Sequence, residues 1–229
     1  MSGRVAVVTG GSRGLGAALV AELVARGDRV VTDARDAAAL AAMVERLGHP
    51  EALVAVPGDL TDAGHRARLA ALAGDRVDVL VNNAGILGPV PLPGVADLAD
   101  GVLEDVFAVN TLAPASLMAA LTPALVRAGG CLVNLSSDAA AGAYAGWGPY
   151  GASKAALDHL TATWAVEQPG LRGYAFDPGD MDTDMHRAWA PGAAGLPSAA
   201  SVVPAVLALI DGGLPSGRYT VDDLRAVRA

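Results

Sequence analysis

Tyr150 and Lys154 are the two side chains of this sequence best suited to move a proton. They are four residues apart, so a helix would place them on one face, a turn from each other. A tyrosine hydroxyl donates a proton slowly near neutral pH, because its ordinary pKa is about 10, and a nearby cation lowers that pKa. Lys154 is the single lysine among 16 basic residues, so the spacing predicts an acid–base pair. An ordinary surface pair on a helix is the alternative.

A glycine-rich turn follows the first apolar run of the chain, at 5–9, and precedes an apolar helical stretch. Glycine allows a sharp turn and lets a pyrophosphate approach the backbone. The N-terminus of the following helix supplies free N–H groups and a partial positive charge. The turn predicts a dinucleotide site, with a tight turn that binds no ligand as the alternative. The residues predicted to contact the cofactor here are Thr9, Gly10, Ser12, Arg13, Gly14, Leu15 and Gly16.

Short β-branched runs alternate with alanine- and leucine-rich helical segments over the whole chain. The predicted strands lie at 5–9, 29–33, 53–56, 77–81, 131–135, 173–176 and 218–221. This alternation implies right-handed crossovers and a parallel sheet, with ligands bound beyond the carboxyl ends of its strands. We expect an α/β fold: one doubly wound Rossmann domain spanning 1–229, with about seven parallel strands and helices on both faces.

The overall composition narrows the class of protein. A net charge of -8 argues against nucleic acid and anionic membranes as partners, because phosphate-binding surfaces are basic. The uncharged stretch 106–126 is interrupted by polar residues and prolines, which favours a buried or subunit-interface helix over a membrane span. No signal peptide fits before the first strand, so we expect a cytoplasmic protein. The four histidines share no ligand spacing with acidic residues or Cys131, and no metal site is expected.

Further polar and glycine residues follow the predicted strands in a fixed order. They are Asp59-Leu60, Asn82-Asn83-Ala84-Gly85, Asn110, Ser136-Ser137, Tyr150 with Lys154, and Pro178-Gly179 with Thr183. Together with the TGxxxGxG turn, this series resembles the short-chain dehydrogenase/reductase family along nearly the whole chain, and its shorter single-domain branch in particular. Each motif is weak by itself, and their shared order carries the resemblance.

The resemblance implies catalytic roles for Asn110, Ser137, Tyr150 and Lys154. The tyrosine would be the acid–base and the lysine would also hydrogen-bond the nicotinamide ribose. The serine would orient the carbonyl group, and the asparagine would hold a water that links the lysine to solvent. The family's interval selects Ser137 over Ser136, since adjacent residues at a strand end point to opposite sides. A purely structural contact is the alternative for the asparagine.

The resemblance also implies the rest of the cofactor site. Asp59 would contact the adenine, and the Asn-Asn-Ala-Gly motif would line the cofactor cleft. The residues predicted beyond the glycine turn are Arg35, Asp59, Leu60, Asn83, Ala84, Gly85, Tyr150, Lys154, Pro178, Gly179, Met181 and Thr183.

The end of the second strand bears on the choice between NAD and NADP. An acidic residue there accepts the ribose hydroxyls of NAD, whereas an arginine binds the 2′-phosphate of NADP. Counted from Gly16, the family's acidic position falls on Ala34, and Arg35 follows it. Arg13 is a second arginine where NADP-using members often have one, while Asp33 opposes the phosphate or turns into the sheet's edge. NADP(H) is the expected cofactor, with NAD(H) as the alternative.

The predicted substrate contacts are mostly apolar or aromatic, which suits a ketone on a ring or hydrocarbon frame. They are Ser137, Ile86, Leu87, Tyr144, Trp147 and Met185, with Met181 and Trp189 as further candidates. Packing under loops is the alternative for the two tryptophans. The substrate-covering segment, 182–198, is short, and the helix that carries Tyr150 is expected to end at 168–170, where a proline interrupts it. We expect a homo-oligomer, either a dimer or a tetramer, and the short helix weakens the case for the tetramer.

The predicted function is an NADP(H)-dependent carbonyl reductase or ketoreductase that reversibly reduces a small-molecule ketone or aldehyde. One alternative is a catalytically silent cofactor-binding regulatory or interaction protein, which would usually lack the tyrosine or lysine. The other is an epimerase or dehydratase relative that uses the same Y-x-x-x-K pair. Such relatives carry a large C-terminal substrate lobe, for which this chain is too short.

Overall fold

Seven parallel strands form one sheet in the computed structural model, which describes residues 3–226. They are β1 (Val5–Val8), β2 (Arg29–Ala34), β3 (Leu53–Pro57), β4 (Val79–Asn82), β5 (Cys131–Leu135), β6 (Arg172–Asp177) and β7 (Gly217–Thr220). Their order across the sheet is β3-β2-β1-β4-β5-β6-β7. The α/β Rossmann fold expected from the sequence is confirmed. The proposed single domain, 1–229, includes 1–2 and 227–229, which lie outside the described residues.

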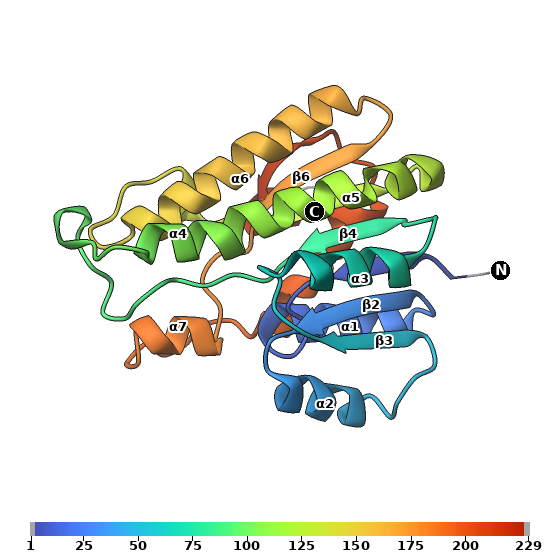
Figure 1. Cartoon of the computed structure of the whole chain (residues 1–229), viewed down its shortest axis with the longest axis horizontal. Coiled ribbons are helices and arrows are strands. Elements are labelled where there is room, and N and C mark those ends of the chain that lie inside the picture. The colour runs from blue at the N-terminus through green and yellow to red at the C-terminus, as the bar shows by residue number, and fades with distance from the viewer. Residues whose placement is uncertain (1–2, 227–229) are drawn as a thin grey trace.

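Helices connect the strands and cover both faces of the sheet (Figure 1). They are α1 (Gly14–Ala25), α2 (Ala37–Arg46), α3 (Ala63–Ala73), α4 (Val102–Phe107), α5 (Ala113–Ala128), α6 (Gly148–Glu167), α7 (Asp184–Trp189), α8 (Val203–Asp211) and α9 (Val221–Ala226). Short turns of other helical types are η1 (Val95–Asp97), η2 (Ala108–Leu112), η3 (Asp138–Ala140) and η4 (Ala199–Val202). The helix that carries Tyr150 ends before Pro169, as the sequence predicted.

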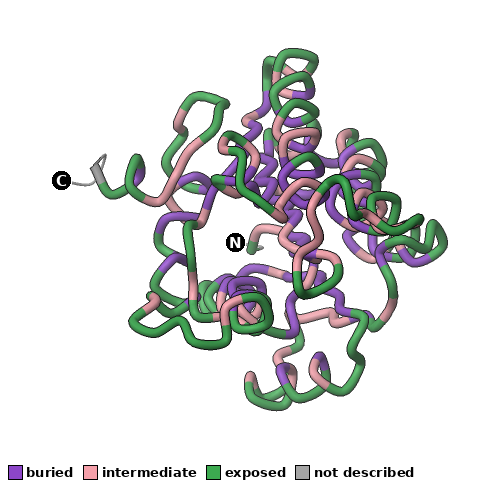
Figure 2. The backbone as a smooth tube through the Cα atoms, turned by 90° about the vertical axis from the view of Figure 1, so that its left-hand side faces the viewer, coloured by how far each residue is buried: buried purple, intermediate pink, exposed green. Residues whose placement is uncertain are grey.

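Two apolar layers result, because alternate residues of each strand point to opposite faces. Ala6 and Val8 pack with α1, α2 and α8, whereas Val7 packs with α3 and α5. Figure 2 shows the buried backbone running through the middle of the molecule, with exposed helical turns around it. Strand β4 begins two residues later than predicted, because the Val77 N–H donates to the carbonyl of Ala124 outside the sheet.

The strand order reverses between β1 and β4, which are neighbours in the sheet although two strands separate them in sequence. The connections that leave their carboxyl ends diverge to opposite faces, and this opens a crevice at that edge. The glycine turn follows β1, and Asn83 follows β4. The fold thus brings two of the predicted motifs to one place.

The helical stretch Val102–Ala128 is long and apolar enough to cross a membrane by length and composition alone. Within its most apolar window, 56% of the residues are buried inside the protein. Leu117, Leu121 and Leu125 of this stretch pack against the sheet. The stretch contains the helix predicted at 106–126 as buried or at a subunit interface, and one of its faces is buried.

Candidate active site

The glycine turn is fixed to the neighbouring strand end by Thr9 and Asn83. The Thr9 Oγ1 accepts hydrogen bonds from the backbone N–H groups of Asn83 (3.0 Å) and Ala84 (3.1 Å). In return, the Asn83 side-chain amide donates to the Thr9 carbonyl at 2.8 Å. A Cβ on Gly16 would lie 2.3 Å from the Gly10 carbonyl oxygen, so only glycine fits there. Thr9 and Gly16 were predicted to contact the cofactor, but neither lines the cavity. They fix the conformation of the turn instead.

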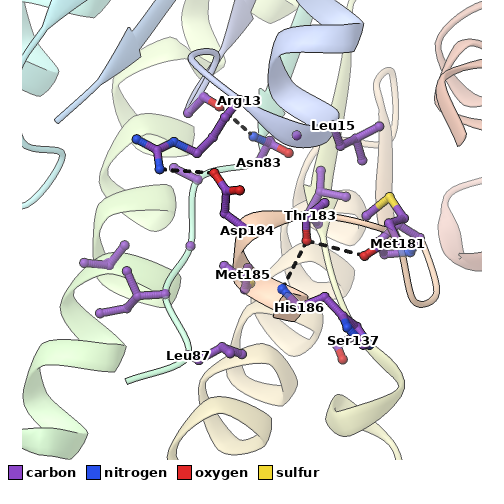
Figure 3. Close-up of a pocket in the computed structure, with 18 of the residues that line it drawn as sticks. Arg13, Leu15, Asn83, Leu87, Ser137, Met181, Thr183, Asp184, Met185 and His186 are labelled. Carbon is purple, nitrogen blue, oxygen red and sulfur yellow. Dashed lines mark hydrogen bonds and ion pairs between the residues drawn. The ribbon is translucent and has the colours of Figure 1, made fainter. Parts of the chain in front are cut away.

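A cavity of about 800 Å³ opens over this turn and extends to α6 and α7 (Figure 3). Most residues predicted to bind cofactor or substrate line it. Those residues are Gly10, Ser12, Arg13, Gly14, Leu15, Arg35, Asp59, Leu60, Asn83, Ala84, Gly85, Ile86, Leu87, Ser137, Trp147, Tyr150, Lys154, Pro178, Gly179, Met181, Thr183, Met185 and Trp189. The roles assigned to them stay predictions.

The predicted catalytic pair, Tyr150 and Lys154, lies in the first two turns of α6, at the wall of the cavity. Tyr150 is 8% exposed and Lys154 is 3% exposed. The Lys154 ammonium donates a 2.7 Å hydrogen bond to the carbonyl of Leu135 at the end of β5, and it lies 5.7 Å from the centre of the tyrosine ring. A Cβ on Gly85 would lie 3.6 Å from the same ammonium nitrogen, so this glycine keeps the backbone after β4 close to it.

Burial dominates the protonation of this pair. It raises the pKa of Tyr150 to about 12, and the hydrogen bond with Ser137 acts in the opposite direction. Burial also lowers the pKa of Lys154 to about 8, while the carboxylate of Asp158 opposes this shift. The sequence predicted that the cation would lower the tyrosine pKa, whereas in the structure desolvation of the phenolate is the largest influence and raises it. Tyr150 is thus a protonated donor near neutral pH.

The two serines after β5 point to different sides, as the sequence predicted. The Ser136 hydroxyl donates to the Asp158 carboxylate at 2.8 Å, away from Tyr150. The Ser137 hydroxyl faces the tyrosine, donates to Asp138 at 3.0 Å and accepts from the Ala139 N–H at 3.2 Å. Ser137 is therefore the serine whose hydroxyl lies beside the proton donor.

Asn110 lies in the π-helical turn η2 and is fully buried. Its side-chain oxygen accepts from the Ile86 N–H at 2.9 Å, and its amide nitrogen donates to the Ile86 carbonyl (2.9 Å) and to Ser153 Oγ (3.0 Å). The amide therefore does not project into the cavity. A π turn inside an α-helix marks many functional sites, and the predicted proton-relay role of this residue stays a prediction.

The aromatic side of the cavity differs from the prediction at Tyr144. This residue is 51% exposed and does not line the cavity, because its hydroxyl turns toward Asp138. Trp147 lies edge-on to Tyr150, with 5.5 Å between ring centres, and edge-on to Trp189 at 5.0 Å. The two tryptophans extend an apolar wall from the proton donor to α7.

Arg218 of β7 is a residue that sequence reasoning missed. Its guanidinium donates to the Ser137 carbonyl (2.9 Å), to Asp177 (3.1 Å) and to Asp158 (3.2 Å). It therefore joins the ends of β5 and β6 to α6, the helix that carries Tyr150 and Lys154. Only the pairing of Ala175 with Arg218 in the sheet brings it there, and no local motif signals that pairing.

The opposite end of the cavity carries charged groups. Arg35 is exposed at the rim, and Arg13 forms ion pairs with Asp36 (2.7 Å) and Asp184 (3.3 Å). Figure 3 shows the second pair linking the glycine turn to α7. Asp33 lies inside the wall, 1% exposed, with its carboxylate bound to the Gly10 N–H at 3.0 Å.

Comparison with known proteins decides the family. The family model for short chain dehydrogenases matches residues 4–193. This chain belongs to the short-chain dehydrogenase/reductase family. It is accordingly an oxidoreductase of a family that binds nicotinamide cofactors.

Three relatives illustrate the membership. An uncharacterized oxidoreductase of Saccharomyces cerevisiae is 37% identical over 188 residues, which cover 80% of this chain and 72% of the yeast protein. Sepiapterin reductase of Meriones unguiculatus is 36% identical over 200 residues, which cover 80% and 76% of the two chains. The crystal structure of a Shigella flexneri 2a short chain dehydrogenase complexed with NADP aligns with a TM-score of 0.87 at 26% identity, over 96% of this chain and 97% of that chain.

The residues of this short-chain dehydrogenase/reductase fit a nicotinamide cofactor. Helix α1 begins at Gly14 without a side-chain cap and without an acidic residue in its first turn. Its first N–H groups therefore remain available to a pyrophosphate above the turn. The cavity leads from this point past Asp59 to Tyr150 and Lys154, and Lys154 has ammonium protons left for ribose hydroxyls after its bond to Leu135.

Proposed function

We propose that this protein is an NADP(H)-dependent carbonyl reductase that converts a small-molecule ketone or aldehyde to an alcohol, reversibly. The observation that carries the proposal is the position of two hydroxyls at one wall of the cavity. The Ser137 hydroxyl faces that of Tyr150, and the Lys154 ammonium lies 5.7 Å from the tyrosine ring. If the Ser137 hydroxyl turns from Asp138 toward a carbonyl oxygen placed between the two groups, that oxygen would accept a hydrogen bond from each. These bonds would stabilise the negative charge that develops during reduction.

Each residue of the site has one task in this reaction. A nicotinamide cofactor, when bound, would supply the hydride that the carbonyl carbon accepts. Tyr150 transfers its proton to the carbonyl oxygen, while Ser137 holds that oxygen in place. The Lys154 ammonium stabilises the phenolate left on Tyr150, and this matters because burial raises the cost of that charge. A proton then returns to Tyr150 from solvent through Lys154, with a water held by Asn110 as the proposed link between that lysine and solvent.

The preference for NADP(H) rests on charge at the ribose end. Arg35 and Arg13 can both reach an anion there, and arginine binds phosphate through paired N–H groups. The acidic residue that favoured NAD in the sequence, Asp33, is buried and already accepts hydrogen bonds. The NADP bound by the Shigella flexneri 2a relative supports the same cofactor.

The substrate that suits this cavity is a ketone carried on a ring or hydrocarbon frame. Trp147, Trp189, Leu87 and Met185 line the space beyond Tyr150 and offer mainly apolar surface. The segment 182–198 covers this space, and its ends pair with each other at Asp182 and Ser198. Sepiapterin reductase among the relatives supports a carbonyl substrate on a ring system.

The proposal is tested by incubating the protein and NADPH with each member of a panel of cyclic and aryl ketones. The fall in NADPH absorbance measures the rate of reduction. Tyr150→Phe is the matched control, since it keeps the ring against Trp147 and removes only the proton donor. We expect a loss of about 10²- to 10⁴-fold in kcat with NADPH binding retained, the usual contribution of general acid catalysis. Tight NADPH binding by the wild type without turnover on any ketone would contradict the proposed activity.

A further inference from the structure

We infer that His65 determines the cofactor preference of this protein by holding the carboxylate of Asp33 away from the ribose. The inference deepens the proposed NADP(H) preference and rests on it. Asp33 lines the cavity at the end of β2, beside Arg35. The family's acidic position falls one residue later, on Ala34, but an acidic side chain at this end of β2 that lines the cavity could also accept the ribose hydroxyls of NAD and repel a 2′-phosphate. The contacts of Asp33 explain why it does neither.

Both oxygens of the Asp33 carboxylate have a partner inside the protein. Oδ1 accepts from the Gly10 N–H at 3.0 Å, within the glycine turn itself. Oδ2 lies 3.0 Å from Nε2 of His65, a residue in the first turn of α3. The side chains of the pair are only 2% and 6% exposed. Burial raises the pKa of Asp33, while its bonds to Gly10 and His65 favour the carboxylate.

The histidine is held in place by a fit that only glycine permits. A Cβ on Gly58, at the end of β3, would lie 2.1 Å from Nδ1 of His65, so the ring occupies the space that any other side chain would need. Asp62 caps the start of α3 by accepting from the Gly64 N–H at 2.7 Å, and this fixes the first turn of the helix that carries His65. The donor to Asp33 is therefore preorganised.

Removal of the His65 imidazole should shift the cofactor preference in one direction, from NADPH toward NADH. Without His65, Oδ2 of Asp33 becomes a buried acceptor without a partner, which is costly. The ribose of the cofactor is the neighbouring source of hydroxyl donors, so a freed carboxylate would gain a bond with NADH. The same negative charge would repel the 2′-phosphate that Arg35 attracts. Loss of one histidine should thus favour NADH and disfavour NADPH at the same time.

The test is the ratio of the dissociation constants for NADH and NADPH, measured by fluorescence titration of the wild type and of His65→Leu. We expect the wild type to bind NADPH more tightly and the substitution to reduce that preference at least about tenfold, since a hydrogen bond to a charged group is exchanged. His65→Gln, which keeps a donor of similar reach, is the matched control and should retain most of the preference. The double variant Asp33→Asn with His65→Leu removes the freed charge and should restore it.

The outcomes distinguish the proposed preference for NADP(H) from the role of His65 in it. A wild type that prefers NADH overturns the proposed cofactor. A wild type that prefers NADPH, with an unchanged ratio in His65→Leu, overturns the role of His65 alone. Should His65→Leu not fold, Asp33→Asn tests the same point with the histidine in place. Because its carboxylate is already bound by Gly10 and His65, that variant should change the ratio by less than about tenfold, and a larger gain in NADPH preference contradicts the inference.

Discussion

The two ends of the cavity are built in opposite ways. At the end formed by α6, Tyr150 and Lys154 are almost entirely buried and fixed by the helix and by the carbonyl of Leu135. At the end formed by the glycine turn and β2, the side chains of Arg13 and Asp36 are 53% and 50% exposed and meet in an ion pair at the rim. One end holds its charged group inside the protein, whereas the rim of the other end carries an ion pair in solvent.

This difference predicts how each end responds to change. Coulomb interactions are strong where burial lowers the effective dielectric constant, and they are weak and screened by salt at the surface. A substitution at the buried end should therefore alter the rate of the reaction by a large factor. A substitution at the exposed end should alter the choice or the affinity of the cofactor by a smaller one.

Lys154→Arg tests the buried end and should have the largest effect. Arginine keeps the positive charge, but its planar, larger guanidinium cannot take the place of a compact ammonium between Leu135, the phenol and the proposed position of the ribose. We expect the protein to fold and kcat to fall on the order of 100-fold. Steady-state kinetics and a melting curve measure this. Turnover close to that of the wild type would show that the compact shape of the ammonium is not required.

The same lysine predicts the pH dependence of the wild type. Burial lowers the pKa of Lys154 to about 8, so the ammonium is present below that pH and is lost above it. Tyr150, with a pKa of about 12, keeps its proton throughout that range. The reduction rate, measured as kcat/KM, should therefore decline as the pH rises through about 8. A rate that stays level up to pH 10 would mean that the lysine charge is not needed.

Much of the buried end was predictable, because its determinants are local in sequence. The i, i+4 spacing of Tyr150 and Lys154 fixes their shared helix face, and alternation along the end of β5 separates Ser136 from Ser137. The apolar runs predicted the seven strands, since parallel strands buried on both faces have no polar side to interrupt them.

The contacts that depend on tertiary structure could not be predicted. His65 and Asp33 are 32 residues apart, and Arg218 and Asp158 are 60 apart, so no spacing rule relates them. Tyr144 was placed in the cavity from its residue type, but the loop after η3 carries it outward. Sequence spacing describes one element at a time, and these positions depend on how elements meet.

Substitution of the arginines tests the exposed end. Arg35→Ala and Arg13→Ala each remove a guanidinium from the rim of the ribose site. We expect the KM for NADPH to rise about tenfold, the effect of one hydrogen bond to a charged group, while the KM for NADH stays nearly constant. Kinetics with both cofactors at fixed ketone concentration measure the difference. An equal loss for NADH and NADPH would contradict both the assignment of these arginines and the contrast between the two ends.

Asp184→Asn should have the smallest effect and is the finest test of the contrast. Asp184 joins α7 to the glycine turn through its 3.3 Å ion pair with Arg13, and both side chains are more than half exposed. An exposed pair contributes little to stability, so the melting temperature should hardly change. Loss of the carboxylate leaves Arg13 with one competing acidic partner, Asp36, and the KM for NADPH should fall by less than about threefold. Added salt should erase that gain, because it screens the same charges. A change that is large or insensitive to salt would mean that the rim is as tightly organised as the buried end.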